Sequence, residues 1–202
     1  MPFDLLPLGH PRLLEAQEDL ESGDLERTSR SKPDWTALHW FGVESQPDGT
    51  EAQARVLLGQ NPSAQNDEGD TPMHLATWAQ HQDRVAFLLE LGADANLPNR
   101  KNHLSIHLAL RKKNSALFAL LLPVTSMTPD LQVDLLKLWA EKGWATSPDA
   151  VVWSWAKAVP KAQWDAAGVV DKLPQNRQKE LRSFWLDQRL PSATSSRSKP
   201  RF

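Results

Sequence analysis

Short apolar runs recur along the first two thirds of the chain and are separated by polar stretches rich in proline and glycine. Three of these runs end alike, in Val56-Leu57-Leu58, Phe87-Leu88-Leu89 and Leu120-Leu121-Leu122. Each follows a tetrapeptide that ends in histidine. The pattern predicts that each run is the apolar end of a short helix.

The tetrapeptides recur at a fixed spacing. They are Thr36-Ala37-Leu38-His39, Thr71-Pro72-Met73-His74 and Leu104-Ser105-Ile106-His107, so the histidines stand 35 and 33 residues apart. Self-similarity at a period of this size is typical of a repeat array, in which each copy buries its apolar face against the next.

The second tetrapeptide contains the signals of a helix start. Thr71 is a good N-cap, and Pro72 has its φ angle preset for the first helical position. A neutral His74 three residues beyond the cap can bond backbone groups of neighbouring loops that stacking would otherwise bury unpaired. We therefore predict structural roles for His74 and for its counterparts His39 and His107.

On these motifs the chain resembles the ankyrin repeat family, and residues 69–102 match its pattern best. The first copy carries the insertion ESQPDGTEAQ, and the third has Leu104-Ser105 in place of Thr-Pro. The resemblance implies an all-α, ankyrin-type helical repeat solenoid over residues 11–126. We assign residues 11–31 to an N-terminal half-repeat that caps the stack.

The resemblance also implies a concave surface, formed by finger loops and first helices, that binds another protein. We expect Trp35 and Trp78 to serve as apolar anchors there, with the charged residues setting the orientation of the partner. The family's variable positions fall on Trp35, Val43, Asp67, Glu68, Asp70, Trp78, Arg100, Lys101, His103, Arg111 and Lys112.

The pattern of residues 127–190 predicts a helical extension that follows the repeat array. Thr128-Pro129-Asp130 and Ser147-Pro148-Asp149 are strong helix starts, and the spacing predicts helices over 129–142, 148–159, 161–171 and 175–189. These helices fit either further degenerate repeats or an unrelated bundle, and we expect them to cap the third copy. Residues 191–202, with three basic residues and no acid, predict a disordered tail.

Six of the nine tryptophans lie in this extension. We expect them to fill its core, because each ring buries a large area. An exposed aromatic surface for a partner is the alternative. Trp153 and Trp155 stand two apart on one helix and cannot both point straight inward, so at least one of them is expected near an edge or an interface.

Charge and composition narrow the function. The net charge is −2, made up of −6 over residues 1–126 and +4 over 127–202, which gives no general attraction to nucleic acid or membrane. The basic run at 111–113 is typical of a solvated helix face. The absence of cysteine and of an N-terminal signal pattern favours a cytoplasmic protein, although export by other routes stays open.

No motif for catalysis, nucleotide binding or a cofactor occurs. His103 and His107 stand four apart, but no third residue has metal-ligand spacing. We therefore predict a non-catalytic adaptor or regulator that needs no cofactor or metal, is monomeric on its own, and binds another protein. Two alternatives remain: an effector or enzyme whose activity lies in the tryptophan-rich helices, with the repeats as targeting arm, or a toxin-neutralising, immunity-type binder.

Overall fold

The computed structural model describes residues 35–43, 61–144 and 149–188. These residues form α-helices and short 3-10 turns with no strand among them, which confirms the predicted all-α class. The chain falls into two compact units, one before and one after the bond between Ser126 and Met127. Each unit is described by itself.

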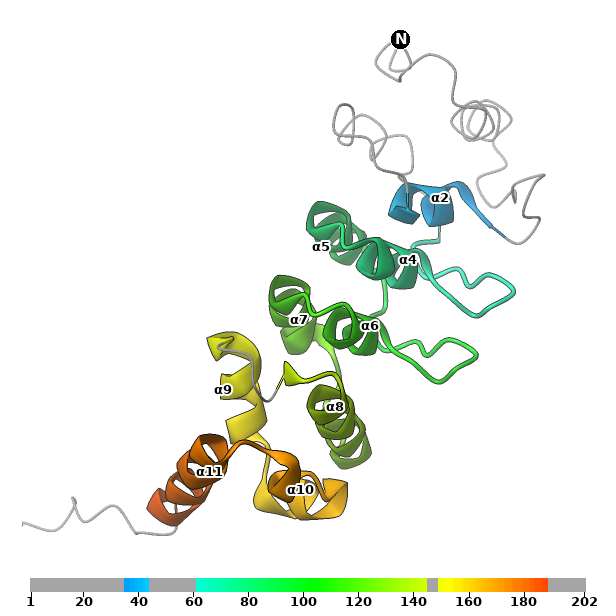
Figure 1. Cartoon of the computed structure of the whole chain (residues 1–202). Coiled ribbons are helices and arrows are strands. Elements are labelled where there is room, and N and C mark those ends of the chain that lie inside the picture. The colour runs from blue at the N-terminus through cyan, green and yellow to red at the C-terminus, as the bar shows by residue number, and fades with distance from the viewer. Residues whose placement is uncertain (1–34, 44–60, 145–148, 189–202) are drawn as a thin grey trace, which may run out of the picture. The chain divides into compact units, whose positions relative to one another are not determined.

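The first unit is a stack of helices joined by extended loops (Figure 1). Helix α4 packs between α2 and α6, and α5 packs beside α7. The elements are α2 (Ala37–Val43), α4 (Pro72–Ala79), α5 (Gln82–Glu90), α6 (Ser105–Arg111), α7 (Ser115–Leu121) and η1 (Leu122–Val124). The helical repeat array that the period predicts is therefore confirmed.

The second copy folds as its residue types dictate. The Thr71 hydroxyl accepts a hydrogen bond from the His74 backbone N–H at 3.3 Å, and Pro72 occupies the first turn of α4. Helix α5 begins directly after His81. Gly92 follows α5 with φ at +83°, a left-handed conformation that glycine adopts without strain.

The third copy keeps this backbone without the same side chains. Leu104 has φ −85° and ψ 162°, almost the same as −85° and 165° at Thr71. Leucine has no hydroxyl to cap α6, and the buried Ser105 hydroxyl has no hydrogen-bond partner among the described residues. The stack therefore imposes the helix start here at the expense of local interactions.

The two extended loops, residues 61–70 and 92–104, lie side by side as fingers (Figure 1). Four hydrogen bonds between described residues join them: the Asp94 N–H to Ser63 Oγ at 2.9 Å, Gln65 Nε2 to the Pro98 carbonyl at 3.0 Å, the Arg100 N–H to the Glu68 carbonyl at 3.0 Å, and Asn99 Nδ2 to Asp70 Oδ1 at 2.7 Å. The fingers thus stack in register with the helices behind them.

The core between the helices is closely packed. Met73, Leu88, Ile106 and Leu117 are fully buried. At Gly42 in α2, a Cβ atom would lie only 2.7 Å from the Pro72 carbonyl oxygen. Helices α2 and α4 can approach this closely because Gly42 has no side chain.

The second unit contains α8 (Pro129–Glu141), α9 (Ala150–Ala158), α10 (Lys161–Ala167), η3 (Val170–Lys172) and α11 (Gln175–Asp187). Thr128 caps α8 as predicted. Asp149 is the N-cap of α9, so that helix begins two residues later than predicted. The helix predicted over 161–171 begins at Lys161 as expected but ends early, because the chain turns to φ +64° at Gly168.

Tryptophans form the core of this unit. The indole of Trp139 stacks on Trp153, with ring centroids 5.7 Å apart, and meets Trp164 edge to face at 5.8 Å. Trp144 and Trp155 are also buried, which confirms the core role for five of the six. Trp153 and Trp155 are only 5% and 8% exposed, so neither belongs to an exposed aromatic surface. The placement of one of them near an edge or an interface stays a prediction.

The predicted cap at 11–31, the insertion in the first copy and the tail at 191–202 lie outside the described residues. Within the described ranges, no helix combines the length and the apolar character needed to cross a bilayer.

Candidate functional site

A groove of about 430 Å³ runs along the first unit, with walls from all three copies. The finger loops form one side of it, and the helices α2, α4 and α6 form the other. Eight of the predicted partner-binding residues line it: Trp35, Val43, Glu68, Asp70, Trp78, Lys101, His103 and Arg111.

Three predicted residues do not line the groove. Asp67 and Arg100 are exposed at the ends of the fingers, outside the hollow. Lys112 is half-buried against Trp78, with its Nζ 3.4 Å from the centre of the indole ring. Lys112 therefore reaches the site through a cation–π contact with a lining residue.

The sequence reasoning missed four lining residues: His74, Leu75, Asn99 and Leu108. The sequence did contain a signal for two of them, because Leu75 and Leu108 directly follow His74 and His107, which with His39 are the signature histidines of the repeated tetrapeptides. Asn99 had a further signal, because it stands 33 residues after Asn66 and both side chains accept two backbone N–H bonds in their own fingers.

The two predicted anchors differ in exposure. Trp78 is 51% exposed, which is unusual for so large an apolar side chain. Trp35 is only 8% exposed and packs with Leu75 and Val43. Trp35 therefore belongs to the floor of the groove, and Trp78 is the residue that projects.

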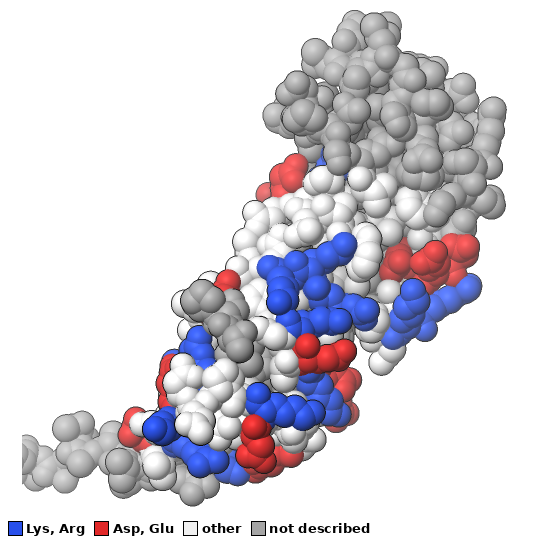
Figure 2. Space-filling model, viewed as in Figure 1, with Lys and Arg blue, Asp and Glu red and all other residues white. Residues whose placement is uncertain are grey.

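Charges of opposite sign come from neighbouring copies. Figure 2 shows acidic and basic side chains close together at the fingers, and a further basic area over the adjoining helices. Burial and the nearby cations of Arg111 and Lys101 lower the pKa of His103. Asp70 accepts its hydrogen bond from Asn99 at the same place.

The signature histidines hold these walls in position. Thr71 donates its backbone N–H to His74 Nδ1 at 3.2 Å, so Nδ1 is the acceptor and Nε2 carries the proton. Nε2 donates to the His103 carbonyl of the next finger at 2.9 Å. His39 Nε2 reaches the Asp70 carbonyl at 3.1 Å in the same way.

The neutral state of His74 fits its surroundings. Burial lowers its pKa, and this effect outweighs the hydrogen bond to the His103 carbonyl. The structure therefore confirms that His74 ties neighbouring loops together. Within the described ranges, no three His, Asp or Glu side chains are grouped closely enough to hold a metal ion.

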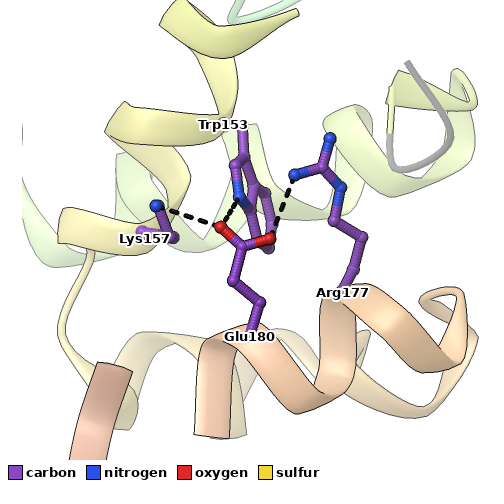
Figure 3. Close-up of polar contacts among 4 residues, drawn as sticks. All are labelled: Trp153, Lys157, Arg177 and Glu180. Carbon is purple, nitrogen blue, oxygen red and sulfur yellow. Dashed lines mark hydrogen bonds and ion pairs between the residues drawn. The ribbon is translucent and has the colours of Figure 1, made fainter. Parts of the chain in front are cut away.

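The second unit has a polar cluster of a different kind (Figure 3). Glu180 on α11 accepts hydrogen bonds from Trp153 Nε1 at 2.8 Å and from Lys157 Nζ at 3.1 Å, both on α9. Arg177 donates to its other oxygen at 3.3 Å and lies 4.5 Å from the Trp153 ring centre. The bond from Trp153 contributes most to the lowered pKa of Glu180. This cluster joins two helices.

A second hollow, of about 390 Å³, lies between α10, η3 and α11. Lys161 and Arg182 line it together with Asp165 and Asp171, so its charges balance. Lys161 and Asp165 already form an ion pair at 2.5 Å. This hollow indicates no particular ligand, and the groove of the first unit is the better candidate.

Comparison with known proteins agrees with the repeat pattern. The sequence model described as Ankyrin repeats (3 copies) matches residues 12–99 and, in an overlapping match, residues 43–133. These matches together span more than half of the chain.

Three similar proteins illustrate how far the likeness extends. Protein lin-12 of Caenorhabditis elegans is 25% identical over 103 residues, 48% of this chain and 7% of that protein. Ankyrin repeat and SOCS box protein 14 of Homo sapiens is 47% identical over 45 residues, 22% and 8% of the two chains. The 26S proteasome non-ATPase regulatory subunit 10 of Dictyostelium discoideum is 32% identical over 86 residues, 41% and 35%. The matches thus span 35% or less of each of these relatives.

Proposed function

The chain belongs to the ankyrin repeat family, and from that premise we propose that it is a non-catalytic adaptor or regulator whose groove binds one partner protein. Ankyrin repeats are protein–protein interaction modules, and each copy contributes to a continuous recognition surface. We assign the binding to the groove lined by all three copies, and we place the protein in the cytoplasm.

The convergence of variable positions on one groove is the observation that carries this proposal. Residues from separate fingers and helices, among them Val43, Trp78 and Arg111, line the same hollow. An exposed tryptophan beside charged residues is typical of a binding hot spot, because the ring supplies contact area and the charges supply orientation.

The rival hypothesis, an activity in the tryptophan-rich helices, has less support. Five of the six tryptophans there are buried in a core, and the indole N–H of Trp153 already donates a hydrogen bond to Glu180. These side chains stabilise the unit and give no reason to assign it a reaction. A toxin-neutralising role would use the same groove and is a special case of the proposal.

Affinity capture tests the assignment of the groove. The tagged full chain and a variant that combines Trp78→Ala with Arg111→Glu and Lys112→Glu would be incubated with lysate from the native cells. Captured proteins would be identified by mass spectrometry. We expect the variant to lose the main partner while its circular dichroism stays unchanged.

The matched control is Lys137→Glu combined with Lys172→Glu, which changes two exposed lysines of the second unit. This control should retain the partner. Equal capture by the groove variant, with folding intact, contradicts the assignment of the groove. Capture by residues 127–202 alone would favour the rival.

A further inference from the structure

We propose that the groove binds an extended partner segment in which one apolar and one acidic side chain stand about three residues apart. The apolar side chain packs against Trp78 and the adjoining floor, and the carboxylate pairs with Arg111 and Lys101. This inference rests on the proposed function and adds the chemistry of the partner.

The third copy supplies two cations to the groove. Lys101 on the finger and Arg111 on α6 both line the groove and are exposed. Both lie close enough to His103 for their charges to lower its pKa. In the described part of the chain neither forms an ion pair with a carboxylate. Arginine and lysine converging on one hollow suit a carboxylate, which accepts from both.

The acidic residues of the groove, Asp70 and Glu68, do not bind a partner carboxylate. Asp70 already accepts a hydrogen bond from Asn99 Nδ2 at 2.7 Å. Glu68 stands on the finger of the second copy, where its charge disfavours a partner carboxylate. The repulsion there and the attraction one copy further along both direct the acidic side chain of the partner to the third copy.

The site for the apolar side chain of the partner lies at Trp78 on α4, one helix layer away from Arg111 on α6. Trp78 is half-exposed, and Trp35, Val43 and Leu75 form one apolar cluster beside it. Lys112 occupies one face of the Trp78 ring at 3.4 Å, which fixes the indole in place. A partner side chain can therefore bind this patch without first ordering the tryptophan.

The spacing follows from the stack. Packed helices stand about 8–10 Å apart, and an extended chain advances about 3.3 Å per residue, so one layer corresponds to about three residues. A hollow of about 430 Å³ is of the size that holds a small ligand or a few side chains. Both points favour an extended segment over a helix.

Peptide display provides the test. Random twelve-residue peptides displayed on mRNA would be selected against the full chain and sequenced. We expect enrichment of Asp or Glu about three residues from an aliphatic or aromatic residue. Enriched peptides would then be titrated by fluorescence anisotropy against the wild type and against the variant Lys101→Glu with Arg111→Glu.

The double reversal should weaken binding at least about tenfold, and replacing the peptide acid by lysine should restore it. The control is Lys113→Glu, an exposed residue that follows α6 and does not line the groove. It should bind as the wild type does. Binding should also weaken as salt is raised from about 0.05 to 0.5 M.

Each remaining outcome is decisive. The inference is overturned, and the proposed function left standing, by peptides that lose affinity for Trp78→Ala but contain no acidic residue. Peptides whose affinity is unchanged by the double reversal while they depend on Trp78 have the same consequence. Peptides that bind Trp78→Ala and the double reversal as well as the wild type contradict the assignment of the groove itself. A selection that enriches no peptide overturns the inference, and the capture experiment then tests the proposed function independently.

Discussion

His74 Nε2 donates a hydrogen bond to the backbone carbonyl of His103, 2.9 Å away in the finger of the next copy. Its other ring nitrogen accepts the Thr71 N–H, so a single imidazole bonds two loops from different copies. We predict that His74→Ala lowers the free energy of unfolding by about 2–4 kcal/mol, because it leaves buried backbone groups unpaired. Urea unfolding followed by circular dichroism measures the change. Gln82→Ala, at an exposed position on α5, should have little effect.

The same histidine makes stability depend on pH. Folding lowers the pKa of His74, and those of His81 and His103, below the ordinary value of 6.5, chiefly by burial. Below that value the unfolded chain binds protons that the folded chain does not, so stability is complete above about pH 6.5 and falls as the pH drops towards the folded-state pKa values. Urea midpoints measured between pH 7.5 and 5 should show this loss. A slope that is unchanged in His74→Ala would exclude His74 as a source.

The start of α6 lacks a side-chain cap and contains an unpartnered Ser105 hydroxyl, so a substitution there is expected to stabilise the chain. Ser105→Pro should raise the free energy of unfolding by about 0.5–1 kcal/mol, because it removes an unpartnered hydroxyl and restricts the unfolded chain. Leu104 already has the extended backbone that a following proline requires. Thermal melting checks this prediction. A lower Tm would mean that the Ser105 N–H or hydroxyl contributes more than the structure indicates.

Close contact between α2 and α4 predicts a large effect from one methyl group. Gly42→Ala should destabilise the chain by about 1–3 kcal/mol, since its Cβ would lie 2.7 Å from the Pro72 carbonyl oxygen. Helix propensity alone favours alanine by about 1 kcal/mol, so a net loss isolates the clash. Gly92→Asn is the comparison without a clash, because nothing lies within 4 Å of that site. Its main cost is the strain of the positive φ, which asparagine tolerates better than most residues, so it should destabilise the chain less than Gly42→Ala.

In the second unit, Glu180→Gln should loosen α11. The variant removes the charge that Lys157 and Arg177 face and weakens the bond from Trp153 Nε1. Because Glu180 is largely exposed, we expect a loss of no more than about 1 kcal/mol. Faster amide hydrogen exchange confined to α9 and α11 would report it. The exposed Glu141→Gln should leave exchange unchanged. Since the pKa of Glu180 is lowered, the effect should disappear as acid protonates the wild type.

The sequence predicted the parts of the fold that are encoded locally. Thr71 and Pro72 mark a helix start by their own chemistry, and the spacing of the histidines reveals the stack. Leu104 shows the limit, because its extended conformation is imposed by neighbouring copies and not by leucine itself. The early end of α10 at Gly168 had a local signal, a glycine within the predicted helix, that the apolar pattern outweighed.

Repeat periodicity predicted most of the residues that line the groove, but it did not predict how far each side chain is exposed. It placed Trp35 and Trp78 on one surface, yet one is nearly covered and the other projects. That difference depends on how Leu75 and Val43 fill the space beside Trp35. Asn99 also recurs with the period, 33 residues after Asn66, and both asparagines accept two backbone N–H bonds in their own fingers. The histidine tetrapeptides alone did not reveal it.

The first two of the repeated histidines each bond to the following copy: His39 reaches the Asp70 carbonyl, as His74 reaches that of His103. The acceptor is a main-chain oxygen, which every amino acid possesses. As far as this bond is concerned, a gene segment encoding one more unit could therefore be inserted without a compensating change of the acceptor in the unit after it. Lineages carrying such a chain are free to lengthen or shorten it by whole units while the side chains facing the hollow diverge.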